Sequence, residues 1–211
     1  MRIRFFGLLI FIPLVFTSCQ PKNKHFFIPA ELSAITKFGD GSYWVYQLKG
    51  NSLIDSIWQV SHEDRLDKEN RGDFIANKHE FNTSFKYKRL PSFELDFMNS
   101  SRINFDPNTD QGNKPSVEIF NMGFLGITET KLVYPFGTKA TDGKGTVADS
   151  VITELVVAGK KFMHVVRVYQ EESMLYGPHI HFYYAPNVGL IRVDEMDYNN
   201  TWELVRYNIA R

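Results

Sequence analysis

The sequence predicts an all-β protein: a single domain of about ten antiparallel strands in a curved sheet or an open barrel or sandwich, with a short N-terminal helix. Three observations favour this class. Apolar and aromatic residues alternate with polar ones over many short runs, turn residues separate the runs, and no long amphipathic helix interrupts them. The chain has 211 residues, which is enough for one sizeable hydrophobic core.

The first 18 residues have the features of a secretory signal peptide. Arg2 and Arg4 precede an apolar run, residues 5–16, which is too short for a transmembrane helix of roughly 20 residues. Small residues and Cys19 follow, and the chain then becomes polar. We therefore expect residues 1–18 to be removed from the mature protein.

The segment Phe-Thr-Ser-Cys at residues 16–19 resembles the lipobox of bacterial lipoproteins, with Phe in place of the usual Leu as in the looser lipoboxes of Bacteroidetes. The resemblance implies that Cys19 carries lipid and that its acyl chains anchor the protein to a membrane of the bacterial cell envelope. The alternative is an ordinary secreted protein, which would leave an unpaired thiol in an oxidising compartment. In Bacteroidetes lipoproteins an acidic cluster after this cysteine favours display on the cell surface. No such cluster follows Cys19, so the resemblance implies an outer-membrane protein that faces the periplasm.

Charge and cysteine content exclude several classes of protein. The chain has 24 basic and 24 acidic side chains, so it lacks the basic field that nucleic-acid binding requires. Its single cysteine excludes an internal disulfide framework and a cysteine-rich zinc module.

The mature chain is expected to consist of a short tether, residues 19–29, and one β-rich domain, residues 30–211. The domain starts with a brief helix over residues 30–38, in which Leu32 and Ile35 lie on one side. The Gly-Asp-Gly sequence that follows ends this helix.

Period-two patterns follow the helix. Residues 43–48 and 53–60 are aromatic and β-branched and flank a Lys-Gly-Asn turn, which predicts a hairpin. A second hairpin is predicted around Gly-Lys-Lys at residues 159–161. The strands of this second hairpin are predicted at residues 147–158 and 162–170. The other strands are predicted at residues 81–88, 93–98, 102–105, 117–121, 128–133, 180–184, 190–194 and 202–207.

The turn sequence Ala-Pro-Asn-Val-Gly at residues 185–189 joins two of the later strands. Asn187 and Gly189 tolerate positive φ, so the chain can reverse there. Together with Gly-Ser-Tyr-Trp-Val-Tyr and Asp-Ser-Ile within residues 41–57, this turn is similar to motifs of uncharacterised Bacteroidetes lipoproteins and of periplasmic β-proteins related to the DUF3108 group. The resemblance implies a curved antiparallel sheet and no agreed activity.

Two segments could bind metal ions. His179 and His181 lie two positions apart, on one face of a predicted strand, and His164 on another strand would have to supply a third zinc ligand. Asp106, Asn108 and Asp110 space oxygen atoms as a calcium loop does, although the Gly and Glu of an EF-hand are missing. The alternatives are ordinary histidines on a polar strand and a plain turn.

Two serines, Ser56 and Ser150, follow aspartate and precede an aliphatic residue. This pattern matches the short O-glycosylation sequence of Bacteroidetes envelope proteins, and solvent-facing strand serines are the alternative.

The function predicted from sequence is that of a lipid-anchored, non-catalytic binding or assembly module. No nucleophile motif, Walker loop or dinucleotide fingerprint is present, so we expect neither an enzyme nor a cofactor. The expected partners are the membrane and an apolar ligand, a glycan or another envelope protein, but no nucleic acid. A glycan-binding accessory protein, with Tyr43, Trp58, Tyr183 or Trp202 lining a groove, and a metal-dependent hydrolase are the alternatives.

The lipid anchor gives the first testable prediction. Cys19→Ser removes the only thiol that can carry lipid, so this variant should lose metabolic lipid labelling and leave the membrane fraction. The conservative variant Ser18→Ala keeps the cysteine and serves as the control. Membrane-bound Cys19→Ser protein would contradict the prediction.

Overall fold

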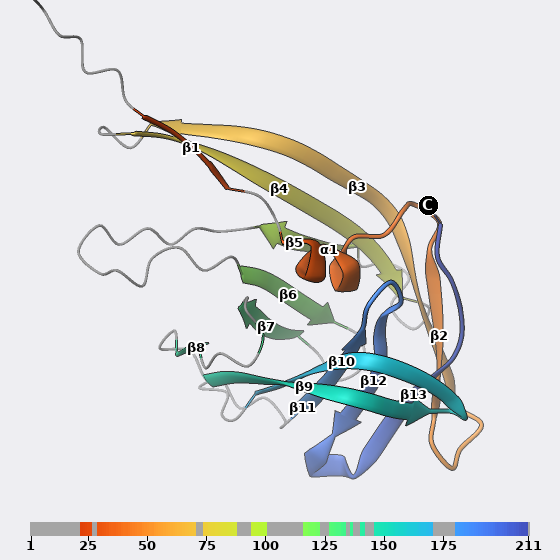
Figure 1. Ribbon diagram of the computed structural model, residues 1–211. Coiled ribbons are helices and arrows are strands. Elements are labelled where there is room, and N and C mark those ends of the chain that lie inside the picture. Colours follow the sequence, from red (N-terminus) through yellow and green to blue (C-terminus); the bar gives the residue numbers. More distant parts are fainter. Residues whose placement is uncertain are drawn as a thin grey trace, which may run out of the picture.

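The computed structural model describes residues 22–26, 29–70, 74–87, 94–100, 116–122, 127–133, 136, 140–141, 146–170 and 180–210. Within these residues the chain is mostly β-strand, accompanied by one short α-helix and one 3-10 turn, η1 (Met196–Tyr198) (Figure 1). The predicted fold class, all-β with a short N-terminal helix, is therefore confirmed. No helix in this part of the chain is long and apolar enough to cross a membrane.

Seven consecutive antiparallel strands form the central sheet, in the order β3-β2-β13-β12-β11-β10-β9. Both predicted hairpins are present, as β2–β3 and β9–β10. The second hairpin turns at Ala158 and Gly159, with φ of 47° and 78°, one residue earlier than predicted. The strands are β2 (Tyr43–Leu48), β3 (Ile54–Asn70), β9 (Thr146–Val157), β10 (Lys160–Gln170), β11 (Ile180–Ala185), β12 (Gly189–Glu195) and β13 (Asn200–Asn208).

Further strands extend the sheet at both ends. β4 (Phe74–Tyr87) pairs with β3, β1 (Lys22–Phe26) and β5 (Glu94–Ser100) pair with β4, and β8 (Ala140–Thr141) pairs with β9. The end strands β1 and β8 do not pair with each other, so the sheet is open. The predicted strand count and the barrel are not confirmed: β6 (Ser116–Met122) and β7 (Ile127–Val133) form a separate pair.

Strand β3 is longer than its sequence pattern predicts. The prediction ended at residue 60, whereas the strand runs to Asn70. Residues 61–70 are almost all polar or charged, so they carry no period-two signal, and it is the antiparallel ladder with β4 that keeps them extended. Together β3 and β4 form a long, curved projection beyond the central sheet, with β1 and β5 along the other edge of β4 (Figure 1).

Helix α1 (Ala30–Thr36) lies within the curve of the sheet (Figure 1). Leu32 and Ile35 are fully buried, and Phe38, just beyond the helix, is buried as well. The predicted helix and its apolar side are therefore confirmed, although the helix ends two residues earlier than expected. Lys37 is extended and terminates it.

The core between α1 and the sheet is rich in aromatic side chains, and the polar atoms of two of them form hydrogen bonds. Trp44 and Tyr46 lie on the inner face of β2 and are nearly inaccessible to solvent. Trp44 Nε1 donates to the carbonyl of Val188, and Tyr46 Oη donates to that of Leu190 at 2.8 Å. These bonds satisfy buried polar groups while the rings contribute apolar area.

The β11–β12 turn adopts the conformation that its sequence predicts. Asn187 has φ of 60° and Gly189 has φ of 86°. The turn contacts α1, because the Asn187 amide donates to the carbonyl of Ala34 at 2.6 Å, one of the acceptors that a helix leaves unpaired at its C-terminus. A Cβ at Gly189 would lie 2.9 Å from Cε2 of Phe38, so only glycine lets the Phe38 ring pack against this turn.

This packing predicts the effect of adding one methyl group. Gly189→Ala should lower the free energy of unfolding by about 1–2 kcal/mol for the positive φ and by about 1–3 kcal/mol more for the collision with Phe38. Gly50→Ala is the matched control, because Gly50 has φ of 74° and a Cβ added there would meet no atom within 4 Å. Urea unfolding should show the larger loss for Gly189→Ala, and equal losses would contradict the packing argument.

Candidate functional site

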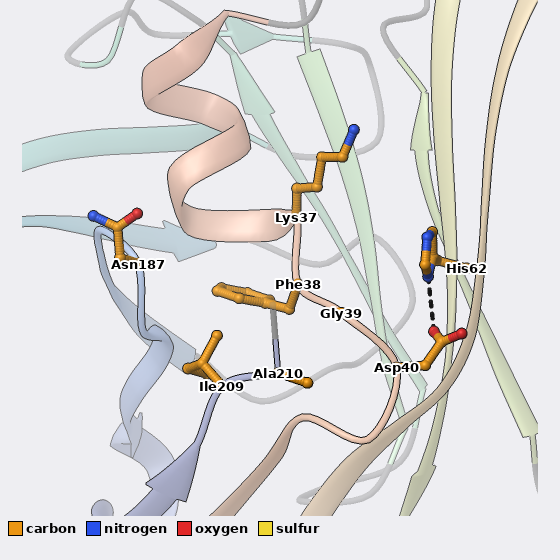
Figure 2. Close-up of a pocket in the computed structure, with 8 residues that line it drawn as sticks. All are labelled: Lys37, Phe38, Gly39, Asp40, His62, Asn187, Ile209 and Ala210. Atoms are coloured by element: carbon orange, nitrogen blue, oxygen red, sulfur yellow. Dashed lines mark hydrogen bonds and ion pairs between the residues drawn. The ribbon is translucent and has the colours of Figure 1, made fainter.

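A pocket of about 580 Å³ opens on the inner side of the molecule, where α1 leads into β2. Three other segments complete it: the inner face of β3, the β11–β12 turn and the end of the chain. Figure 2 shows the side chains that surround the opening. The lining residues are Lys37, Phe38, Gly39, Asp40, His62, Asn187, Ile209 and Ala210.

The connection between α1 and β2, residues 37–42, is held in place by Gln59 of β3. Gln59 is 1% exposed, and its Nε2 donates to the carbonyl of Phe38 at 2.7 Å and to Asp40 Oδ1 at 3.3 Å. Its backbone amide donates to the carbonyl of Ser42 at 2.8 Å, and its own carbonyl accepts from Gly41 at 3.1 Å. One residue therefore fixes the shape of the whole connection.

Gln59 also marks an irregularity in the β3–β4 ladder. The register shifts between Gln59 and Ser61, so Val60 is an extra residue on β3. Such a bulge bends a strand and changes the direction of the side chains that follow. After the bulge, His62 and Asp64 lie two positions apart, on one face of β3, and both reach the connection.

Two ion pairs link β3 to the connection beside the pocket. His62 Nδ1 lies 2.8 Å from Asp40 Oδ1 (Figure 2), and Lys37 Nζ pairs with Asp64. The hydrogen bond with His62, and next the one from Gln59, lowers the pKa of Asp40, whereas partial desolvation opposes this shift. Asp40 is therefore ionised down to a lower pH than an ordinary aspartate.

The opposite wall of the pocket is apolar and contains the last described residues of the chain. Ile209 and Ala210 lie beside the ring of Phe38 (Figure 2). Gly39 donates to the carbonyl of Ala210 at 3.2 Å, and the amide of Ala210 donates to Ser42 Oγ at 3.0 Å. These two hydrogen bonds hold this wall of the pocket against the connection.

The pocket can bind a small molecule with several polar groups. Its volume lies within the range of about 300–1,000 Å³ that is typical of small-molecule sites. Lys37, His62 and Asp40 offer donors and acceptors of both charges on one side, and Asn187 adds an exposed amide. Phe38 and Ile209 supply apolar contact on the other side.

The histidines that the sequence singled out are not gathered into one site. His181 lies on β11, opposite Tyr169 of β10. His164 is five residues earlier on β10, about 17 Å along a strand, so it cannot share a metal ion with His181. His179 lies outside the described residues, among which no group of three His, Cys, Asp or Glu side chains could hold a metal.

His164 is unusual for another reason. Its φ is 54°, in the left-handed region that few residues other than glycine adopt, and its side chain is exposed.

The other candidate residues are placed as follows. Cys19, Asp106, Asn108 and Asp110 lie outside the described residues, so the lipid anchor and the calcium loop stay predictions. The two candidate glycosylation sites, Ser56 on β3 and Ser150 on β9, are both half-buried strand residues.

The outer face of the sheet holds a self-contained polar cluster around Asp194. This carboxylate is 7% exposed and accepts hydrogen bonds from Arg192 at 2.8 and 2.9 Å, from Tyr183 Oη at 2.9 Å and from Thr201 Oγ1 at 3.0 Å. Burial, and next the charge of Asp194, raise the pKa of Tyr183 to about 12. These hydrogen bonds link β11, β12 and β13.

The aromatic residues proposed for a ligand groove fall into two groups. Trp202 and Tyr183 are buried, at 3% and 7% exposure. Tyr43 and Trp58 are half-buried and lie directly opposite each other on β2 and β3, on the face of β2 away from buried Trp44. Only this second pair is available to a ligand.

Sequence reasoning missed the residues that form the pocket. Asp40 was assigned to a turn, and His62 and Asp64 belong to the polar half of β3 that showed no strand pattern. The available signal was their spacing, since His62 and Asp64 would share a face if the strand continued. Nothing in the sequence indicated that residues 37–40 would meet them.

Comparisons with known proteins add no identification. No family model, no curated protein and no solved structure matches the chain. The resemblance to periplasmic β-proteins therefore stays a prediction.

The pair between Asp40 and His62 predicts a pH dependence of stability. Because the pKa of Asp40 is lowered by folding, its contribution is fully present above the ordinary value of 3.8 and is lost as the pH falls through the lower, folded-state pKa. Asp40→Asn should therefore be less stable than the parent at pH 7, with a difference that shrinks below about pH 4. Urea unfolding between pH 3 and 7 measures this.

The control for this prediction is His62→Ala, which removes the main cause of the shift. In that variant the carboxyl resonance of Asp40 should titrate closer to 3.8 in an NMR experiment. A difference between Asp40→Asn and the parent that does not vary with pH would contradict the assignment.

Proposed function

We propose that this protein is a lipid-anchored envelope protein whose β domain is a non-catalytic binding module for a small polar ligand. The observation that carries the proposal is the pocket of about 580 Å³ beside α1, with two ion pairs on one side and an apolar wall on the other. The lipobox-like segment ending at Cys19 supports the anchor, and the lack of an acidic cluster after Cys19 supports a location on the periplasmic side of the outer membrane.

A polar ligand has more support than an apolar one. An apolar carrier needs an empty, apolar interior, but within the described residues the apolar side chains of α1 pack against the aromatic and aliphatic side chains of the central strands. The pocket itself is bordered by the polar side chains of Lys37, His62 and Asp40, which an apolar ligand would shield from solvent without forming hydrogen bonds to them. We therefore favour a ligand that carries both hydrogen-bonding groups and a small apolar part.

Glycan binding is the second candidate, and one observation favours it. Tyr43 and Trp58 are half-exposed neighbours on the outer face of the β2–β3 hairpin, away from the pocket. Aromatic rings at a surface provide flat apolar area with a polar edge, which suits the faces of a sugar. The two candidates therefore use different faces of the same sheet.

The pocket is tested by native mass spectrometry of protein purified from envelopes, followed by titration with any ligand that is found. Lys37→Met should weaken binding by about tenfold or more, since a hydrogen bond to a charged group contributes about 1.5–3 kcal/mol. Lys49→Met is the matched control, because Lys49 also forms an ion pair, with Glu203 at 3.4 Å, but does not line the pocket.

The outcomes separate the two candidates. Loss of binding in Lys37→Met but not in Lys49→Met supports the pocket. Binding that survives Lys37→Met and is lost in Trp58→Ala supports the glycan surface instead. Equal affinity in all three variants would contradict both.

A further inference from the structure

Part of the predicted tether belongs to the sheet. Residues 22–26, within the predicted tether, form β1, which pairs in parallel with β4. The register joins Lys22 to Phe74 and Phe26 to Lys78. Phe74 is the first residue of β4, so β1 begins at the far end of the β3–β4 projection (Figure 1).

We call this projection the arm and define it as residues 61–70 of β3 and 74–84 of β4, which pair from Ser61–Ser84 to Asn70–Ile75. The edge of β4 away from β3 is used twice: β1 pairs with residues 74–78 and β5 with residues 80–86. β1 therefore fills the stretch of this edge that β5 leaves open. Its pairing makes the end of the arm three strands wide.

The arm is fastened to the body at its base. The two ion pairs beside the pocket, Lys37–Asp64 and Asp40–His62, both join the arm to the α1–β2 connection. From His62 to Asn70 the arm extends over eight residues, which is about 27 Å of strand. The pocket thus lies at one end of the arm and β1 begins at the other.

We propose that the tip of the arm is the membrane-facing end of the protein, and that the lipid bilayer is the surface on which it rests. This inference depends on lipidation of Cys19, which belongs to the proposed function. Cys19 precedes Lys22 by three residues and can lie no more than about 11 Å from it. The anchor is therefore confined to the arm tip, and the pocket lies at the other end of the arm, about 27 Å away along the strand.

A flexible tether would behave differently. If residues 19–29 were a random coil, the anchor could wander about 19 Å from the start of α1 and the domain could turn any side to the membrane. With β1 in the sheet, residues 22–26 are paired with β4 and lie along the arm. The pocket then lies at the end of the arm away from the anchor.

The pairing of β1 is tested first, without lipid, in the mature chain carrying Cys19→Ser. Asn23 and Ile75 are register partners, so Asn23→Cys with Ile75→Cys should form a disulfide under mild oxidation. In the control, Asn23→Cys with Asn70→Cys, the two positions are separated by β4, roughly 10 Å apart, and should not bridge. Equal cross-linking of the two pairs, or none in the first, would overturn the proposal.

The orientation is tested next with the lipidated protein on phosphatidylcholine vesicles that contain an acceptor-labelled lipid. Cys19 is the only cysteine of the chain, so one introduced cysteine is a unique site for a donor dye. Lys68, Ser61 and Ser52 are exposed and lie progressively further from the arm tip along β3 and its preceding turn. Energy transfer should decrease in the order Lys68→Cys, Ser61→Cys, Ser52→Cys.

The two experiments distinguish the inference from the proposed function. Equal energy transfer from the three positions overturns the arm as the membrane-facing end, whereas the anchor at Cys19 stands. Failure of the protein to stay on vesicles overturns both, because no lipid then holds it. Specific cross-linking together with graded energy transfer supports both.

Discussion

The hydrogen bonds of the buried Gln59 side chain are the constraint on which the pocket depends. Its amide nitrogen donates to the carbonyl of Phe38 and to the carboxylate of Asp40, and these two bonds join the α1–β2 connection to β3. Leaving a buried carbonyl without its hydrogen-bond donor costs about 1–3 kcal/mol, so the bonds from Gln59 favour one backbone conformation of the connection. That conformation places Asp40 within hydrogen-bonding distance of His62. It also packs the ring of Phe38 against Gly189 in the β11–β12 turn.

Phe38 packs the α1–β2 connection against the rest of the core. Its ring meets Trp44 edge to face, with centroids 5.2 Å apart, and covers Gly189. Trp44 in turn donates to the carbonyl of Val188 in the same turn. The N-terminal connection, strand β2 and the β11–β12 turn are therefore packed as one unit, although more than 140 residues separate Trp44 from Val188.

Features that depend on local conformation were predictable from sequence. The turn at residues 185–189 takes positive φ at Asn187 and Gly189, as these residue types favour. The helix is short, with Leu32 and Ile35 buried, because their spacing places them on one side. Strand β3 was only half predicted, because its polar half is extended through pairing with β4 and not through its own pattern.

By itself, the sequence determined the all-β class, the two hairpins, the buried side of α1 and the residues that reverse the chain. These follow from short-range periodicity and from φ preferences, which act within a few residues. Only the tertiary structure decided the pocket and the place of β1. Both arise where segments distant in sequence meet, Asp40 with His62 and Lys22 with Phe74, and no local pattern carries the register of such pairs.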